Sequence, residues 1–291
     1  MKLLITGANG QVGWEIIQRA KKLGIDFCPL NHAQLDITDK SAVAKVVTEY
    51  SPDYLVNAAA YTAVDKAENK ADLAFAVNAQ GASNLAMICH QHSIPLVHIS
   101  TDYIFDGTKQ GEYTEQDLPR PINVYGRTKW QGEQAIKENC SRHIILRTSW
   151  VFGVHGHNFV KTMLSLAKQR DHLDIVNDQY GGPTSASAIA DVILAMIKKI
   201  DSSNQSYWGV YHFSGAPYVS WFEFAREIFD RAADLTGIPI PELQGVATES
   251  YPTRAKRPAN SRLGCSKIKD VFDINPANWK ASVIEIINAN T

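Results

Sequence analysis

The stretch from Lys2 to Gly13 reads KLLITGANGQVG and decides how this chain of 291 residues folds. An apolar run of β-forming residues ends in three glycines, Gly7, Gly10 and Gly13, and a segment of helical period follows at once. Glycines permit a tight turn and a close approach of the backbone to a pyrophosphate, which the free amides of a helix start attract. The stretch therefore predicts a strand, a dinucleotide-binding turn and a helix. A glycine-rich turn without a ligand is the alternative.

This strand and helix are the first in a repeated alternation. The runs expected as buried parallel strands are Lys2–Thr6, Asp26–Leu30, Tyr54–Asn57, Pro95–Ser100 and His143–Thr148. The segments of helical period between them are Val12–Leu23, Lys40–Tyr50, Ala71–His92 and Val124–Asn139. The alternation predicts an α/β fold of Rossmann type, a doubly wound parallel sheet with helices on both faces.

The alternation loosens after about Val151. Glycine and proline residues separate the further expected helices, which are Phe159–Gln169, Ala186–Lys199, Trp221–Leu235 and Ala281–Asn288. We expect residues 1–150 to form the dinucleotide-binding domain, with later segments returning to it, and residues 151–291 to form mainly a smaller, mixed substrate-binding lobe. A cleft between the two parts is a usual place for a ligand.

The overall composition favours a small-molecule partner. The net charge of −1 provides no broad basic surface for nucleic acid or anionic membranes, and no apolar run approaches membrane-spanning length. The N-terminal apolar run is too short for a signal peptide. The four cysteines lie far apart without a CxxC pair, which argues against a disulfide framework and fits a reducing cytoplasm. The sequence does not reveal whether the chain forms a homodimer.

The residues after the second strand bear on the choice of dinucleotide. Many such folds carry an acid there, which binds the adenosine ribose. Here the chain reads PLNHAQ, with Asn31 and His32 in place of a carboxylate or an arginine. Asp36, in LDITD, is the next candidate for a ribose or adenine contact. The sequence therefore leaves both NADH and NADPH open.

A tyrosine and a lysine lie one helical turn apart in VYGRTKW, as Tyr125 and Lys129. A free phenol has a pKa near 10 and is a slow proton donor at neutral pH. A neighbouring ammonium and a bound nicotinamide cation would favour phenolate; lowering the pKa by about three units requires roughly 4 kcal/mol. The pair therefore predicts a general acid, whereas a chance pair on a helix surface is the alternative.

Two further segments favour chemistry over chance. STDYIFDG, from Ser100 to Gly107, follows the fourth strand and places Thr101 at the carboxyl edge of the sheet, where its hydroxyl can bind a carbonyl oxygen. NAAAYTAVDKAE, from Asn57 to Glu68, leaves the third strand with small residues that make room for a nicotinamide ribose. Together with the glycine turn, these segments predict a hydride-transfer site.

In their order along the chain, GxxGxxG, NAAA, STD and YxxxK resemble the extended short-chain dehydrogenase/reductase family. Six longer motifs resemble a subgroup of it that reduces a 4-keto-6-deoxy sugar attached to dTDP: NAAAYTAVDKAE, STDYIFDG, PINVYGRTKWQGE, ILRTSWVFG, NDQYGGPT and RPANSRL. The resemblance implies that a reduced nicotinamide delivers hydride to carbon 4 of the sugar.

The resemblance also implies residue roles. Tyr125 would protonate the developing alkoxide, Lys129 would hold the nicotinamide ribose, and Thr101 would bind the carbonyl oxygen. Asp102 and Trp150, with Thr101, match positions that contact the sugar nucleotide. The expected cofactor-binding residues are Gly7, Gly10, Gln11, Val12, Gly13, Asn31, Asp36, Ile37, Ala60, Tyr61, Thr62, Tyr125 and Lys129.

We assign no residue as a metal ligand. His155 and His157 form an HxH pair, but no nearby carboxylate or cysteine completes a zinc site. Glu15 matches a magnesium position of some relatives, whereas the region DQYGGPTSAS lacks the acidic partners expected there. The question of Mg²⁺ therefore stays open.

Other readings of the same scaffold are compatible with parts of the sequence. A 4,6-dehydratase needs an acid after the threonine and aspartate, and Tyr103 stands there instead. Another nucleotide-sugar reductase or a 4-epimerase stays open. A noncatalytic regulatory subunit of the methionine adenosyltransferase type would keep the fold without requiring Thr101, Tyr125 and Lys129 together.

Overall fold

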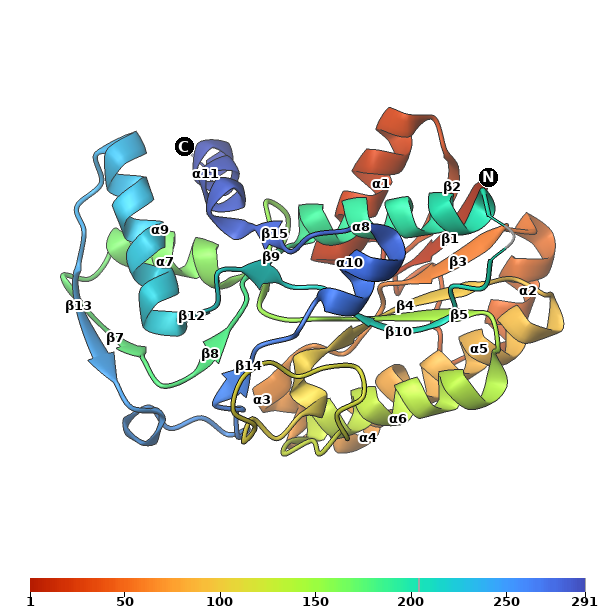
Figure 1. Ribbon diagram of the computed structural model, residues 1–291, viewed down its shortest axis with the longest axis horizontal. Helices are drawn as coiled ribbons and strands as arrows, with labels where there is room; N and C mark the ends of the chain where they lie inside the picture. Colours follow the sequence, from red (N-terminus) through yellow and green to blue (C-terminus); the bar gives the residue numbers. More distant parts are fainter. Residues whose placement is uncertain (204, 291) are drawn as a thin grey trace.

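The computed structural model describes residues 1–203 and 205–290, so Thr291, at the end of the expected second lobe, lies outside the described residues. Six described strands form one parallel sheet in the order β10-β5-β4-β3-β1-β2 (Figure 1). Their bounds are β1 Lys2–Thr6, β2 Asp26–Leu30, β3 Tyr54–Asn57, β4 Leu96–Thr101, β5 His143–Thr148 and β10 Gly209–His212. The strand order reverses at β1 and β3, and ligands bind outside the carboxyl ends of strands at such a point.

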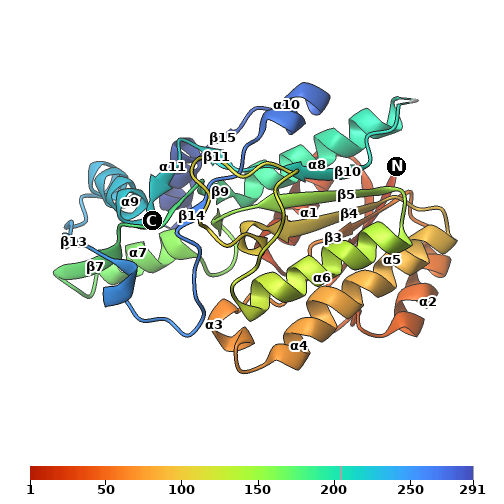
Figure 2. The same cartoon turned by 60° about the horizontal axis from the view of Figure 1, so that its bottom comes forward.

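Helices cover both faces of this sheet (Figures 1 and 2). One face packs against α1 (Gln11–Leu23), α8 (Ala186–Asp201) and α10 (Ser266–Phe272), and the other against α2 (Lys40–Tyr50), α5 (Ala82–Gln91) and α6 (Val124–Asn139). Alternate residues of β1 face opposite sides, with Leu3 and Ile5 in the first core and Leu4 in the second. The predicted doubly wound α/β fold is confirmed.

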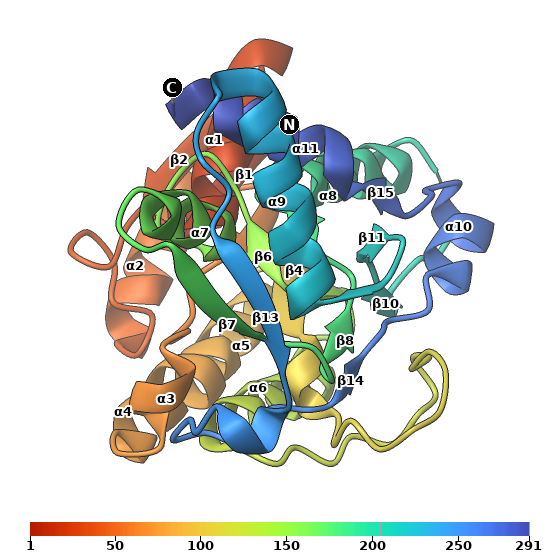
Figure 3. The ribbon, with the colours of Figure 1, turned by 90° about the vertical axis from the view of Figure 1, so that its left-hand side faces the viewer.

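A smaller lobe has its own core, in which Phe224 and Trp279 are fully buried. Its helices are α7 (Phe159–Ala167), α9 (Trp221–Thr236) and α11 (Trp279–Asn290). Beside them β7 (His172–Val176) pairs in parallel with β13 (Glu242–Val246) (Figure 3). Short strand pairs connect the parts of the chain: β6 Val151–Phe152, β8 Tyr180–Gly181, β9 Thr184–Ser185, β11 Gly215–Ala216, β12 Val219–Ser220, β14 Asn260–Ser261 and β15 Ala277–Asn278. A division of the chain at residue 150 stays a prediction.

The helix expected at Ala71–His92 is divided in the structure. It consists of α4 (Ala71–Phe75), a π-helical turn η1 (Ala76–Gly81) and α5. A Cβ atom on Gly132 of α6 would lie 2.1 Å from the carbonyl oxygen of Asn78, so α6 and the π turn are in close contact. Short helices occur also at α3 (Val64–Ala67), η2 (Asp102–Ile104) and η3 (Thr248–Ser250). Apolar periodicity cannot reveal a π turn, because the same face stays buried.

All four cysteines are free in the structure. Within the described residues, every helix is too short or too polar to cross a membrane.

Candidate active site

A cavity of about 580 Å³ lies at the carboxyl edge of the sheet. The glycine turn, the ends of β3, β4 and β5, the first turn of α6 and the start of α9 all contribute to its walls. Ten of the residues predicted from the sequence line it: Gly10, Gln11, Val12, Ala60, Thr62, Thr101, Asp102, Tyr125, Lys129 and Trp150.

The glycine turn closes one end of the cavity. A Cβ atom on Gly7, which has a φ of 70°, would lie 2.5 Å from the carbonyl carbon of Ala58, and one on Gly13 would lie 2.3 Å from the Gly7 oxygen. These two glycines therefore pack β1, β3 and α1 together and do not line the cavity. Gly10, at the N-cap of α1, lines it without a side-chain cap. A helix start left bare in this way fits a pyrophosphate.

The segment that follows β3 is hydrogen-bonded to a buried asparagine, Asn78. In the π turn, the Oδ1 atom of Asn78 accepts the N–H of Tyr61 at 2.8 Å, and its Nδ2 donates to the Tyr61 carbonyl at 3.1 Å. The same Nδ2 donates to the hydroxyl of Thr128 at 3.1 Å. Asn78 thereby fixes the NAAAYT segment against α6.

Thr101 and Tyr125 both line the cavity, and their hydroxyls are close enough to hydrogen-bond. Thr101 ends β4, and its hydroxyl donates to Asp102 at 3.0 Å and accepts the N–H of Tyr103 at 3.2 Å. The ring of Tyr103 meets the ring of Tyr125 edge-on at 5.6 Å. A Cβ atom on Gly126 would lie 2.0 Å from the Tyr103 carbonyl oxygen, so glycine permits α6 to start this close to β4.

The phenol of Tyr125 is more weakly acidic than a free phenol. Burial raises its pKa to about 12. A hydrogen bond with Thr101 lowers this pKa, and the charge of Asp102 raises it further. The sequence predicted a pKa lowered by Lys129 and a bound nicotinamide cation, whereas burial in the structure raises this pKa. The physical reason is that the Lys129 amine is bonded elsewhere and burial dominates.

Lys129 is buried beneath the cavity. Its Nζ atom donates to the carbonyl of Ile99 at 2.7 Å and lies 3.1 Å from Nε2 of His98. Burial lowers the pKa of Lys129 to about 8, and the nearby charge of Glu133 opposes that change. This lysine therefore gains and loses its proton close to neutral pH.

Asp102 is a buried acid beside the same tyrosine. Burial raises its pKa to about 6, while hydrogen bonds with Ser261 and Thr101 lower it. Ser261 lies on β14, so this acid connects the STD segment to the last part of the chain.

Trp150 forms an aromatic wall with a residue that the sequence did not single out. Its ring stacks on that of Trp221 with centroids 3.6 Å apart and planes 8° apart. A Cβ atom on Gly181 would lie 2.6 Å from the Trp150 ring, so this glycine makes room for the indole. Trp221 also lines a second cavity of about 500 Å³, together with Gln179, Tyr251 and Arg257. The sequence around Trp221 is typical of the start of a helix and did not indicate a functional site.

Other lining residues were also missed. Thr148 at the end of β5 and His157 after β6 both face the cavity. The Thr148 hydroxyl is buried without a hydrogen-bond partner among the described residues. An unpaired buried hydroxyl is available to a bound ligand.

Besides Gly7 and Gly13, four further predicted cofactor residues do not line this cavity. Asn31 accepts the N–H groups of Ala33 and Gln34 in the turn that follows it, and Asp36 accepts the N–H and the hydroxyl of Thr38. Ile37 packs in the core beside Gly81, and the backbone of Tyr61 is bonded to Asn78. Their roles toward a cofactor, and the choice between NADH and NADPH, stay predictions.

The residues considered for metals have other partners. His155 stacks on Trp14, His157 contacts Thr162, and Glu15 forms an ion pair with Arg19. Across residues 1–203 and 205–290, no three histidine, cysteine or acidic side chains come together as a metal site would need.

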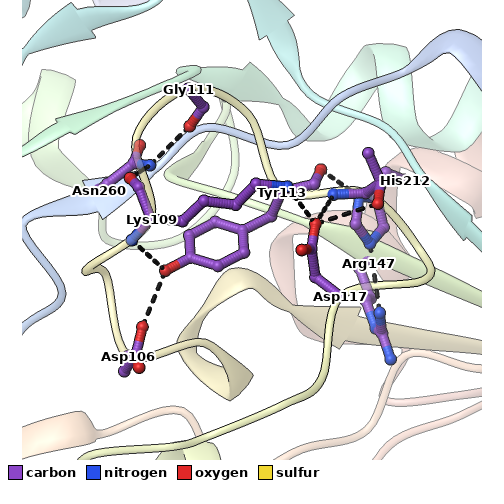
Figure 4. A network of polar contacts seen from close by, with 9 residues as sticks. Asp106, Lys109, Gly111, Tyr113, Asp117, Arg147, His212 and Asn260 are labelled. Carbon is purple, nitrogen blue, oxygen red and sulfur yellow. Dashed lines mark hydrogen bonds and ion pairs between the residues drawn. The ribbon is translucent and has the colours of Figure 1, made fainter.

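A polar network connects the loop after STDYIFDG to the sheet, and Figure 4 shows its part from Tyr113 through His212 to Arg147. Arg147 of β5 pairs with Glu133 of α6 at 2.7 Å, and Glu133 accepts the hydroxyl of Ser100 at 2.6 Å. The Nε2 atom of His212 accepts from Arg147 at 3.3 Å, and its Nδ1 donates to the carbonyl of Tyr113 at 3.1 Å. The network thus ties the loop after STDYIFDG to the sheet.

A dinucleotide turn, a threonine at the end of β4, and a tyrosine and a lysine on one helical turn, all around one cavity, define an oxidoreductase of the extended short-chain dehydrogenase/reductase class. Within that class the comparison with known sequences is specific. Residues 1–291 match the family described as RmlD substrate binding domain, and the chain belongs to this family.

Individual relatives are similar over nearly their whole length. The chain is 44% identical to dTDP-4-dehydrorhamnose reductase of Aggregatibacter actinomycetemcomitans, and 98% of each chain is covered. The crystal structure of a dTDP-4-dehydrorhamnose reductase from Clostridium acetobutylicum has a TM-score of 0.92 at 40% identity, with 99% of each chain covered. That of the Bacillus anthracis enzyme, in complex with NADP, has a TM-score of 0.90 at 38% identity and covers 100% of this chain and 99% of that one.

Proposed function

We propose that the chain catalyses the NAD(P)H-dependent reduction of the 4-keto group of dTDP-4-dehydro-L-rhamnose, giving dTDP-L-rhamnose. The observation that carries this proposal is the gathering of Thr101, Tyr125 and Lys129 around a cavity that the glycine turn closes. The family membership and the names of the relatives support the substrate.

The residues present fit a nicotinamide dinucleotide. The bare helix start at Gly10 would hold the pyrophosphate, and Gln11, Val12, Ala60 and Thr62 would line the rest of the cofactor. When bound, the reduced nicotinamide supplies the hydride that adds to carbon 4. The Bacillus anthracis relative binds NADP, and we expect this chain to accept NADPH, NADH or both.

The side chains of the site bind the carbonyl oxygen, donate the proton and hold the cofactor. The Thr101 hydroxyl binds the carbonyl oxygen, and Tyr125 donates the proton that the new alkoxide accepts. A pKa of about 12 keeps the phenol protonated at neutral pH, which suits a proton donor. Lys129, with its pKa of about 8, is mostly cationic at neutral pH and holds the cofactor ribose.

The sugar nucleotide would extend from the first cavity into the second. The stacked indoles of Trp150 and Trp221 form an apolar wall for the sugar. Arg257 lines the second cavity and pairs with Asp65 at 2.6 Å, so its guanidinium is oriented for an anionic group. The pyrophosphate and the base would bind in this second space.

The test is direct turnover. The purified protein is mixed with dTDP-4-keto-6-deoxy-L-mannose and NADPH or NADH, nicotinamide oxidation is followed by absorbance, and the sugar product is identified. We expect dTDP-L-rhamnose with at least one cofactor. Lack of turnover with both would contradict the proposal.

The alternatives predict other results. A 4-epimerase would return an epimer without net oxidation of the nicotinamide. A regulatory subunit would bind cofactor without turnover, and replacing Tyr125 would leave its binding unchanged. The homodimer and the cytoplasmic location also stay proposals; the free cysteines fit the latter.

A further inference from the structure

A chain of four buried side chains runs behind the cavity, from Thr6 through Asn57 and His98 to Lys129. None of the four is more than 2% exposed. The register of β3 and β4 sets Asn57 opposite His98, and the lysine reaches the histidine from α6. Only Lys129 of these four lines the cavity. The other three are therefore free of any direct contact with a ligand there.

The orientation of the Asn57 amide is fixed at one end of this chain. Its Oδ1 atom accepts the hydroxyl of Thr6 at 2.7 Å and the backbone N–H of Ala59 at 3.1 Å. The Nδ2 atom therefore faces Nδ1 of His98, at 2.9 Å. An amide nitrogen only donates, so Nδ1 of His98 has to accept.

This orientation determines which ring nitrogen of His98 carries hydrogen. Burial, followed by the charges of Lys129 and His143, lowers the pKa of His98 well below its ordinary value, so the ring is neutral and has one N–H. With Nδ1 accepting, that hydrogen is on Nε2, which faces the Lys129 nitrogen at 3.1 Å. A neutral amine has a lone pair to accept it, and an ammonium has none.

Every hydrogen bond from Thr6 through Asn57 and His98 to Lys129 thus has a donor and an acceptor when Lys129 is a neutral amine. An ammonium needs Nε2 to accept, which moves the ring hydrogen to Nδ1 and turns the Asn57 amide. The Ala59 N–H then loses its acceptor, at the point where the chain leaves β3 to line the cavity. A partly buried N–H that loses its acceptor destabilises this arrangement, so the cationic state of Lys129 is disfavoured.

We propose that His98 is a positioning residue for the reaction, which weakens the hold of Lys129 on its proton by donating Nε2–H to the neutral amine. This role rests on the proposed reductase function. After Tyr125 has given its proton to the alkoxide, an N–H bond of the Lys129 ammonium breaks and the O–H bond of the phenol forms again, directly or through one intervening hydroxyl. The amine left behind accepts from His98, and water later returns its proton.

The titratable groups around Lys129 and His98 are consistent with this loss and return of the Lys129 proton. The charged group near Lys129 on its own helix is Glu133, and β4 faces it with His98 and the Ile99 carbonyl. The other titratable group near His98 is His143 of β5. A lysine pKa of about 8 makes both charge states accessible near neutral pH.

The tautomer of His98 can be measured without substrate or cofactor. In the full-length protein labelled with ¹⁵N-histidine, two-bond ¹H–¹⁵N spectra distinguish the tautomers, and the signal missing from His98→Gln identifies His98. We expect Nε2–H for His98 above about pH 9, where a lysine of pKa about 8 is neutral, and a change toward Nδ1–H below it. An Nδ1–H tautomer at every pH would overturn the proposal.

The same spectrum contains two internal controls. The Nδ1 atoms of His143 and His212 face the backbone carbonyls of Cys140, at 2.6 Å, and Tyr113, at 3.1 Å. A carbonyl only accepts, so both rings should stay in the Nδ1–H form throughout the titration.

A kinetic experiment separates positioning from a structural role. In His98→Gln the amide oxygen can turn toward the ammonium, so the alkaline limb of kcat/KM should move to higher pH by about one unit, a tenfold change in the ionisation constant. His143→Gln, a buried histidine on the next strand, should leave the limb unchanged. An unchanged or lowered limb in His98→Gln contradicts the proposal. An unaltered protein that fails to turn over contradicts the reductase function instead, and the tautomer measurement still decides the role of His98.

Discussion

Tyr125 is the proton donor of the proposed reaction, and its environment differs from what its spacing to Lys129 suggested. Sequence spacing correctly placed the two on one turn of α6 and at one cavity. It could not reveal that the amine bonds to β4, because that contact depends on how the helix packs on the sheet. The raised pKa keeps the phenol protonated, which suits the proton donor of the proposed reaction.

This arrangement predicts the pH dependence of the reaction. The pKa of Tyr125 is raised to about 12, so the phenol keeps its proton throughout the working range. The pKa of Lys129 is lowered to about 8, and the proposed function requires its cationic form, which is present below that pH. We expect kcat/KM to fall about tenfold per unit as the pH rises above about 8. A profile that stays flat to pH 10 would show that the lysine charge is not needed.

At the scale of elements, the sequence predicted five of the six parallel strands and most of the principal helices closely, because apolar period and glycine turns are local signals. It did not predict the edge strand β10 or the short helix α10. The π turn of η1 and the partners of Asn78, Asn57 and His98 were not predictable from one sequence. They arise from register and from close helix contacts, which are set only when distant segments pack.

The start of α6 illustrates how such a contact shapes the site. Gly126 has no room for a Cβ atom beside the Tyr103 carbonyl, so Gly126→Ala should push α6 away from β4. We expect a loss of about 1–3 kcal/mol in the free energy of unfolding, as for other overpacked sites, measured by urea denaturation. We also expect kcat to fall at least tenfold, since small displacements of catalytic groups are costly.

A control on the same helix is available. Gln131 is exposed on α6, and Gln131→Ala should change the free energy of unfolding by less than about 0.5 kcal/mol. If Gly126→Ala behaves like this control, the close approach of α6 has no part in forming the site.

At the scale of the whole molecule, the two cavities meet at Trp221, and its stack on Trp150 joins the end of the sheet to the start of α9. The sequence indicated Trp150 through its motif. It gave no indication of Trp221, which comes from a later and ordinary helix start. Residues brought to a site from a second part of the chain are the hardest to predict from motifs.

The stack predicts how the substrate is bound. Trp221→Ala should raise KM for the sugar nucleotide about tenfold, because it removes an aromatic wall worth roughly 1.4 kcal/mol. KM for the reduced cofactor should stay within about twofold. Trp208→Ala, which alters an indole packed on the core of the sheet, is the matched control. Equal effects on both KM values would contradict a role confined to the sugar nucleotide.

The central claim is that Tyr125 donates the proton that completes the reduction of a ketone. The most direct measurement compares the unaltered protein with Tyr125→Phe for single-turnover reduction of dTDP-4-keto-6-deoxy-L-mannose and for cofactor binding by fluorescence. We predict a loss of about 10²–10⁴-fold in rate, as expected for removal of a general acid, with the cofactor Kd unchanged within about twofold. Reduction by Tyr125→Phe at close to the unaltered rate would contradict the account.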